Sequence, residues 1–390
     1  MSESVAIIDW NEGGHHGTYL LNYSANLAAL GARVLVMTAE GRALDELNRQ
    51  SGCRAVSIPS YDWIKRRRWI TPWLARRAYV GLLVRTLRDA ENRYGIHCQR
   101  ILLGCLYENH TPTVCRLFSN LNLPCAAIYI HSGVFHAGGG KPQGKRAAAV
   151  TAALRHPALE RIFLPDESMA AAVAAHSRKP VSVVPDFTDA TVDPNWRPPP
   201  GYPPDKPVVG LLGHLRPNKG TALMARIVVE HPEVDAFFLF AGDLPRGSHT
   251  PEEWAMIERA KQRPDRALFL PGHLREGHLN ALLRTCEVVW VLYPNNPHSA
   301  NLLTKAAIFH KPVLAAEGTL TGLRTARHRM GLCADWRNSA AVAEALQSLI
   351  DPRNRKAVLP NPDWNGYAAR HSRQALAEPL ADWLAADRAG

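Results

Sequence analysis

Short runs of apolar and β-branched residues alternate with helical patterns along the whole chain. A proline-rich stretch divides these runs into a group of four and a group of five. Such alternation is typical of parallel sheets covered by helices, and it predicts an α/β protein with two Rossmann-like units. The predicted strands are VAIID (5–9), RVLVMT (33–38), RILLG (100–104), CAAIYI (125–130), VVGLLG (208–213), DAFFLFAG (235–242), ALFLPG (267–272), EVVWVLYP (287–294) and KPVLAA (311–316).

The stretch between the two groups runs from Asp186 to Pro207 and is too rich in proline for a helix or a central strand. It is predicted to be an interdomain linker. The first unit then covers residues 1–185 and the second covers residues 208–362. The remainder, 363–390, predicts an amphipathic helix, bent at Pro379, that crosses back to the first unit.

The composition indicates which kind of partner the protein binds and which cellular compartment it occupies. The net charge of +11 indicates an anionic partner: a nucleotide, a lipid head group, a membrane surface or nucleic acid. The seven cysteines form an odd set with no C-x-x-C pair, so neither a disulfide framework nor a metal site is predicted. No apolar run approaches the roughly 18 to 20 residues of a membrane helix, and no basic leader precedes the first strand. A cytoplasmic protein is expected.

The turn after the first strand of the second unit carries more positive charge than a turn needs. Gly213 and Gly220 enclose His214, Arg216 and Lys219, and a helical pattern follows. Exposed backbone amides, a helix N-terminus and a positioned lysine together favour a diphosphate site. The alternative is a purely structural turn, because basic residues are common in loops.

A second turn of this kind follows the run EVVWVLYP. The loop from residue 295 to 301 is predicted to present backbone amides at the start of a helix near Leu302, which makes Ser299, Ala300, Asn301 and Leu302 candidate donor-binding residues. Two anion-facing turns in one unit favour a shared phosphate ligand.

In the first unit, candidate residues follow two strands. Gly13 and Gly14 precede a helix and would let a ligand approach backbone amides, although the spacing is not the dinucleotide fingerprint G-x-G-x-x-G. His15 and His16 in the same loop are either ligand contacts or surface residues. His131 directly follows a strand and is a candidate for substrate contact, with a structural histidine as the alternative.

Residues 139–145 imitate a phosphate-binding loop, but Arg146 stands where Ser or Thr must hold magnesium, so an ATPase is not favoured. The segment 61–83 interleaves aromatic and basic residues, which suits an anionic membrane interface or an anionic acceptor. A solvated basic helix face with buried tryptophans is the alternative, and RNA binding is disfavoured because no RNA-binding signature accompanies the segment. The basic residues are Lys65, Arg66, Arg67 and Arg68, beside Trp63, Trp69 and Trp73.

With these motifs in place, the sequence resembles the GT-B glycosyltransferases, and particularly the retaining family 4 enzymes that use nucleotide sugars. GGHHGTYLL is similar to the opening glycine loop of that family, IYIHS to the strand that ends in its sugar-contacting histidine, and GHLRPNKG to its Gly-Arg-Leu-x-x-x-Lys-Gly turn. The resemblance implies two Rossmann-like domains facing each other across a cleft. It also implies that His131 contacts the sugar and that Lys219 binds the diphosphate.

The chain departs from the family pattern at three positions. His214 stands where the family has arginine, which leaves Arg216 as a possible substitute. Pro297 and Lys305 stand where the family has two glutamates, the second of which binds ribose. Lys305 is therefore expected either to face the donor, through a ribose oxygen or a phosphate, or to lie on the solvent side of its helix.

The sequence thus predicts a membrane-peripheral glycosyltransferase with a nucleoside-diphosphate-sugar donor, a lipid-linked or saccharide acceptor, no cofactor, no metal and no nucleic-acid partner. Retention of configuration, with the leaving phosphate assisting the acceptor, is implied by the resemblance alone. A nucleotide-sugar 2-epimerase is one alternative. A catalytically silent GT-B protein in a polysaccharide assembly is another, because both family glutamates are missing.

Overall fold

The structure is a computed structural model that describes residues 3–11, 16–67, 70–130, 132–137, 144–203 and 205–386, without the side chains of Arg42 and Lys65. The chain divides into two compact units. The first comprises residues 1–185 and 372–390, and the second comprises residues 186–371. Each unit has its own hydrophobic core.

In its described residues, the first unit contains a seven-stranded parallel sheet in the order β3-β2-β1-β4-β5-β6-β7. The central strands are buried along their whole length, which explains why their sequences are continuous apolar runs. The strands are β1 (Ser4–Asp9), β2 (Arg33–Thr38), β3 (Cys53–Ser57), β4 (Arg100–Leu103), β5 (Cys125–Ile128), β6 (Leu159–Leu164) and β7 (Val181–Val183).

The second unit contains, in its described residues, a six-stranded parallel sheet in the order β10-β9-β8-β11-β12-β13. Its strands are β8 (Val208–Leu212), β9 (Phe237–Gly242), β10 (Ala267–Pro271), β11 (Val288–Val291), β12 (Val313–Ala316) and β13 (Gly331–Ala334). The predicted fold class of two parallel-sheet, Rossmann-like units is therefore confirmed. All nine predicted strands are present, while β3, β6, β7 and β13 were not predicted.

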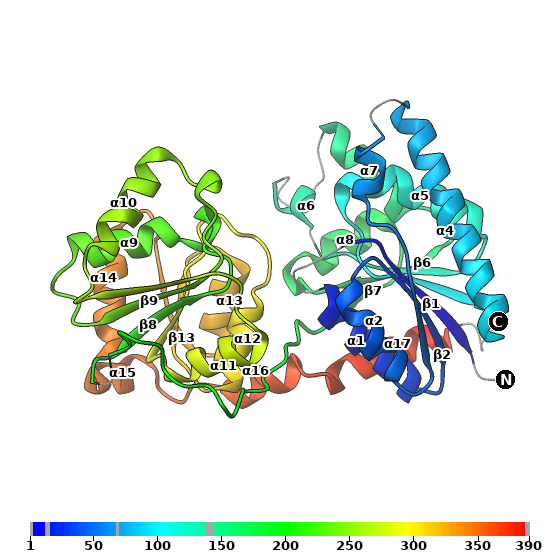
Figure 1. Ribbon diagram of the computed structural model, residues 1–390. Coiled ribbons are helices and arrows are strands. Elements are labelled where there is room, and N and C mark those ends of the chain that lie inside the picture. The colour runs from blue at the N-terminus through cyan, green and yellow to red at the C-terminus, as the bar shows by residue number, and fades with distance from the viewer. Residues whose placement is uncertain are drawn as a thin grey trace. The chain divides into compact units, whose positions relative to one another are not determined.

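Helices lie on both sides of each sheet (Figure 1). Their ends follow local sequence signals, as in α4, where Thr71 accepts a hydrogen bond from the amide of Leu74 and Gly95 ends the helix with a φ of 59°. The helices of the first unit are α1 (His16–Ala29), α2 (Leu44–Arg49), α3 (Asp62–Lys65), α4 (Pro72–Tyr94), α5 (Thr111–Leu121), α6 (Gly133–Ala137), α7 (Gly144–Leu154), α8 (Ala170–Ser177) and α17 (Ala377–Ala385). Those of the second are α9 (Thr221–Glu230), α10 (Pro251–Lys261), α11 (Glu276–Thr285), α12 (Asn301–Ile308), α13 (Leu320–Arg327), α14 (Ser339–Ile350), α15 (Pro352–Val358) and α16 (Trp364–Arg370).

The C-terminal segment returns to the first unit, but it is not one helix bent at Pro379. The chain leaves helical geometry after Arg370, and α17 begins only at Ala377. Pro379 lies in the first turn of α17, where its missing N–H has no helical partner to lose. Trp383 anchors α17 by donating a hydrogen bond to Glu160 and by packing edge-on against Phe163.

Both sheets change direction at their centres, and this places the candidate site residues. In each unit the chain builds the sheet outward from its first strand, then crosses to the other side, so the switch lies between β1 and β4 and between β8 and β11. Ligands of open parallel sheets bind beyond the carboxyl ends of strands at such a switch. The loops after β1, β4, β8 and β11 therefore matter most.

The seven cysteines lie within the described ranges and are all free thiols. Among the described residues, the helices are too short or too polar to cross a bilayer, and no cluster of three or more metal-ligating side chains is found there.

Candidate functional site

The turn between β8 and α9 has a backbone that requires glycine at both ends. Gly213 has a φ of 102° and Gly220 a φ of 73°, values that glycine adopts without steric cost. A Cβ atom on Gly220 would lie 2.6 Å from the carbonyl oxygen of Leu292. The indole of Trp290 donates to the carbonyl of Lys219 at 3.2 Å. The turn is thus packed tightly against β11 and the loop that follows it.

Positive charge is concentrated at this turn. His214 and Arg216 are exposed, and the ammonium of Lys219 lies 3.9 Å from the centre of the Tyr293 ring. Burial lowers the pKa of Lys219 to about 8, a shift that Asp186 opposes and Arg216 reinforces. Burial and the neighbouring Arg216 also lower the pKa of His214. Because an anion would stabilise each of these charged forms, the turn at the N-terminus of α9 is suited to bind one.

A cavity of about 660 Å³ lies beside this turn. This volume is within the range of small-molecule binding pockets in proteins. Asn218 and Gly220 of the turn line it together with Arg226 of α9. The loop after β13 contributes Trp336 and Arg337. The second unit therefore offers space, an aromatic surface and further positive charge next to the cationic turn.

The start of α12 is the second predicted anion-facing turn. Ala300 and Leu302 are buried and Ser299 is partly buried. The side-chain amide of Asn301 donates to the carbonyl of Phe187 at 3.2 Å, and its oxygen accepts from the hydroxyl of Thr188 at 2.5 Å. The side chain of Asn301 thus binds Phe187 and Thr188 of the same unit. For this turn, contact between the backbone amides and the nucleotide-sugar donor stays a prediction.

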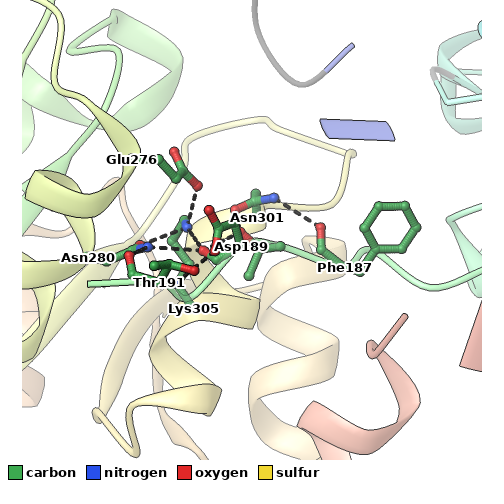
Figure 2. A network of polar contacts seen from close by, with 8 residues as sticks. Phe187, Asp189, Thr191, Glu276, Asn280, Asn301 and Lys305 are labelled. Atoms are coloured by element: carbon green, nitrogen blue, oxygen red, sulfur yellow. Dashed lines mark hydrogen bonds and ion pairs between the residues drawn. The ribbon is translucent and has the colours of Figure 1, made fainter. Parts of the chain in front are cut away.

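Lys305 is the centre of the polar network in Figure 2. Its ammonium donates to the carboxylate of Glu276 at 2.5 Å, to the side-chain oxygen of Asn280 at 2.8 Å and to the backbone carbonyl of Asp189. The side chain of Lys305 is 4% exposed, whereas that of Glu276 is 47% exposed. Burial lowers the pKa of Lys305, although the charge of Glu276 opposes the shift.

This arrangement differs from the solvent-side expectation for Lys305, because the side chain is buried and its three hydrogens are engaged by the protein. A contact between Lys305 and the donor stays a prediction. Asn280 donates in turn to the carbonyls of Asp189 and Thr191, at 3.1 and 2.8 Å. Lys305 and Asn280 therefore fasten the proline-rich segment to α11 and α12 within the second unit.

In the first unit, a cavity of about 400 Å³ lies at the carboxyl ends of β1 and β4. His16 lines it, and its Nδ1 is 2.7 Å from the carboxylate of Asp9, while its Nε2 is 3.0 Å from the hydroxyl of Tyr107. The side chains of His16 and Asp9 are 11% and 1% exposed. Of the two sequence alternatives for His16, ligand contact or surface residue, the structure excludes the surface.

The walls of this cavity are held by buried aromatic contacts. The indole of Trp10 donates to Nδ1 of His110 at 3.1 Å, and Tyr61 stacks on the His110 ring with 3.5 Å between ring centres. Asp9 can approach β4 only because residue 104 is glycine, since a Cβ there would lie 2.8 Å from that of Asp9. Sequence reasoning missed Asp9, Trp10, Tyr107 and His110. The available signal was their position at the carboxyl end of β1 or in the loop that follows the adjacent strand β4.

Several predicted residues lie outside the described part of the chain: Gly13, Gly14, His15, Arg68, Trp69, His131 and the side chain of Lys65. Among the described residues that follow β5, His136 is 2.7 Å from Asp166, which also accepts hydrogen bonds from Ser168. The proposed sugar contact of His131 stays a prediction.

The predicted basic and aromatic surface is only partly exposed. Trp63 is partly buried against the core, and the guanidinium of Arg67 lies 3.5 Å above its ring, while Arg66 is exposed. At the start of α4, Trp73 and Leu74 are 51% and 46% exposed. Among the described residues of this region, Trp73 and Leu74 rather than Trp63 are therefore the large apolar side chains exposed to the surroundings.

Comparison with known proteins identifies solved structures that share this fold. No family model matches this sequence, and no curated protein sequence matches it either. Solved structures do match: sucrose-phosphate synthase from Thermosynechococcus elongatus is 17% identical with a TM-score of 0.71 over 98% of both chains.

Two further matches are HepE from Anabaena in complex with UDP-glucose and WaaG, a glycosyltransferase involved in lipopolysaccharide biosynthesis. HepE is 15% identical with a TM-score of 0.71, over 98% of this chain and 99% of its own. WaaG is 13% identical with a TM-score of 0.63, over 97% of this chain and 98% of its own. At these identities the likeness shows a shared fold, which is the GT-B fold of two Rossmann-like domains.

Proposed function

We propose that the chain is a glycosyltransferase that moves a sugar from a nucleoside-diphosphate donor, bound by the second unit, to a lipid-linked or saccharide acceptor bound by the first. The observation that carries the proposal is the cationic turn at the start of α9, where Lys219 sits beside a helix N-terminus at the switch point of the sheet. The fold shared with HepE, which was solved with UDP-glucose, supports a nucleotide-sugar donor.

In this proposal the protein stabilises the leaving diphosphate. As the bond from the sugar C1 to the phosphate oxygen breaks, negative charge grows on the diphosphate. Lys219, Arg216 and the N-terminus of α9 would neutralise that charge without a metal ion, and such electrostatic stabilisation usually contributes more to an enzyme's rate than any other effect. Turnover should therefore persist in the presence of a chelator. Retention of configuration stays a prediction of the family resemblance.

The alternative of a catalytically silent protein rests on Pro297 and Lys305, which replace the two glutamates of the resembling family. Turnover of UDP-, GDP-, ADP- and TDP-sugars, with and without saccharide acceptors, separates the possibilities. Acceptor-dependent release of the nucleoside diphosphate supports transfer. An isomerised sugar without an acceptor indicates a 2-epimerase, and no turnover of any donor supports the silent protein.

We further propose that the protein works in the cytoplasm, bound peripherally to an anionic membrane through the start of α4. Arg77 and Arg116 hold their guanidinium groups 5.7 and 5.0 Å from the ring centre of the exposed Trp73. An exposed indole flanked by cations suits the interface, where the ring enters the head-group region and each cation near the surface contributes about 1 kcal/mol.

The protein is therefore expected to bind vesicles that contain anionic lipid and to be released by salt. The double variant Trp73→Ala/Leu74→Ala should bind less, because it removes the apolar surface that enters the bilayer. Co-sedimentation with vesicles measures this. Leu323→Ala, which alters an exposed leucine of the second unit, is the matched control, and equal recovery with neutral and anionic vesicles would refute membrane binding.

A further inference from the structure

The cavity in the first unit differs in chemistry from the rest of this basic chain. None of its described lining residues is a lysine or an arginine, although the chain carries a net charge of +11. Aromatic rings alternate with amide, hydroxyl and carboxyl groups around it. Such a lining suits a neutral, hydroxyl-rich ring, which packs its apolar face on an aromatic side chain and hydrogen-bonds through its edges. The lining residues are Trp10, Asn11, His16, Ser60, Tyr61, Asp62, Tyr107, Asn109 and His110.

Three side chains form a directed hydrogen-bond chain that reaches this cavity. Asp9 is buried, and the neutral tautomer of His16 that carries its proton on Nδ1 donates that proton to the carboxylate of Asp9. In that tautomer Nε2 of His16 is an acceptor, and the hydroxyl of Tyr107, 3.0 Å away, can donate to it. Asp9 is itself held by the backbone and side-chain amides of Asn11, at 3.0 and 2.9 Å. Because a phenol oxygen accepts hydrogen bonds as well as donating one, Tyr107 can also receive the proton of a hydroxyl group in the cavity.

We propose that this cavity holds the reacting hydroxyl of a neutral saccharide acceptor, and that Tyr107 and His16 relay the proton of that hydroxyl away during sugar transfer. The inference rests on the proposed function and adds to it a proton acceptor and a substrate class. Tyr107 is the catalytic residue that touches the acceptor, His16 is the base, and Asp9 is a positioning residue.

The relay balances as a single step. The acceptor oxygen forms a bond to C1 of the donor sugar, and the bond from C1 to the phosphate oxygen breaks with its electron pair on the leaving diphosphate. The acceptor proton moves to the oxygen of Tyr107 as the Tyr107 proton moves to Nε2 of His16. The resulting imidazolium is stabilised by the carboxylate of Asp9, the arrangement by which a buried carboxylate assists a histidine base.

The pH at which His16 becomes a base is set by its neighbours. Burial lowers the pKa of His16, but its hydrogen bond to Asp9 and the charges of Asp9 and Glu40 outweigh burial, so the pKa lies above its ordinary 6.5. Burial raises the pKa of Tyr107, which therefore stays a phenol. In the described part of the chain, the other titratable groups around the relay are Cys105, whose pKa burial raises, and Tyr61, Asp62 and His110 in the cavity lining.

The test is turnover of whichever of UDP-, GDP-, ADP- or TDP-glucose the protein uses, with octyl glucoside as the neutral acceptor. Tyr107→Phe and His16→Gln should each lower kcat by roughly 10²- to 10⁴-fold, the usual contribution of a proton acceptor. Wild-type kcat should rise with pH through a value above 6.5, and Asp9→Asn should move this acidic limb to lower pH. His97→Gln, an exposed histidine of the same unit, should change neither rate nor profile.

A second measurement needs no turnover. The ring nitrogens of His16, followed by NMR, should respond to octyl glucoside in the wild type and not in Tyr107→Phe. An unchanged pH profile in Asp9→Asn, or a His16 signal insensitive to the glucoside, would overturn the relay. Absence of wild-type turnover with every donor would instead count against the proposed function, and a near-parental thermal unfolding transition of the first unit shows that the variants are folded.

Discussion

Lys219→Ala is expected to lower kcat/KM for the nucleotide sugar by roughly 10- to 150-fold. One charge-assisted hydrogen bond to a phosphate contributes roughly 1.5 to 3 kcal/mol, and about 1.4 kcal/mol corresponds to a factor of ten. The loss should appear in kcat/KM because the lysine stabilises the charge that grows on the leaving diphosphate. Steady-state kinetics with varied donor measure it.

The matched control is Lys206→Ala, which removes an exposed lysine of the same unit whose ammonium donates to the carbonyl of Asp265. This variant should keep the parental kcat/KM. If Lys219→Ala were as active as Lys206→Ala, the positive charges between Gly213 and Gly220 would have no role in donor binding.

Because the pKa of Lys219 is lowered, its contact with the diphosphate is expected to depend on pH. Because burial lowers that pKa to about 8, the ammonium is charged below this pH and loses its proton above it. Affinity for a nucleoside diphosphate should therefore fall as the pH rises through 8, by up to about tenfold per pH unit. The nearby His214 titrates at lower pH and does not affect this window. Calorimetric titration of Lys219→Ala should show no such decline.

Lys305→Glu is expected to destabilise the second unit by about 3 to 5 kcal/mol. The substitution removes the donor that satisfies Asn280 and the Asp189 carbonyl, and it places a second carboxylate against Glu276 in a site where Lys305 is 4% exposed. Burying an unpaired carboxylate at position 305, and leaving the buried partners of Lys305 without a donor, together have a cost of this order. Urea unfolding measures the change.

Exchanging the charges of Lys305 and Glu276 tests whether the loss of their ion pair causes the destabilisation. The double variant Lys305→Glu/Glu276→Lys restores opposite charges and should recover part of the loss, with a coupling energy between about 0.5 and 3 kcal/mol. A Lys305→Glu protein of parental stability with altered donor preference would show instead that Lys305 faces the nucleotide.

Most of the strands that the sequence predicts are buried along their whole length, such as β1, β8 and β11, whereas β10 is a predicted edge strand with partial burial. The strands that it does not reveal are mostly at the sheet edges. β7 has only three residues, none of them buried, and β3 alternates buried and exposed positions. An edge strand covers less apolar surface, so its sequence carries a weaker apolar signal than a central strand.

The residues of the candidate site also differ in how well the sequence predicts them. The turn between Gly213 and Gly220 is local, so its glycines and cations are visible in one short stretch. The partners of Lys305 and His16 are not local: Glu276 lies 29 residues before Lys305, and Tyr107 lies 91 residues after His16. Which side chain satisfies a buried charge depends on tertiary packing, and spacing along a single sequence does not encode it.

The most direct test of the account is the binding of nucleoside diphosphates to the intact protein. Thermal unfolding in the presence of UDP, GDP, ADP or TDP should show stabilisation by at least one of them, about 2.7 kcal/mol when the ligand is at 100 times its dissociation constant. The same nucleotide should stabilise Lys219→Ala much less. If none of the four shifts the unfolding transition, or if Lys219→Ala is stabilised as much as the parental protein, the second unit does not bind its donor at the turn between Gly213 and Gly220.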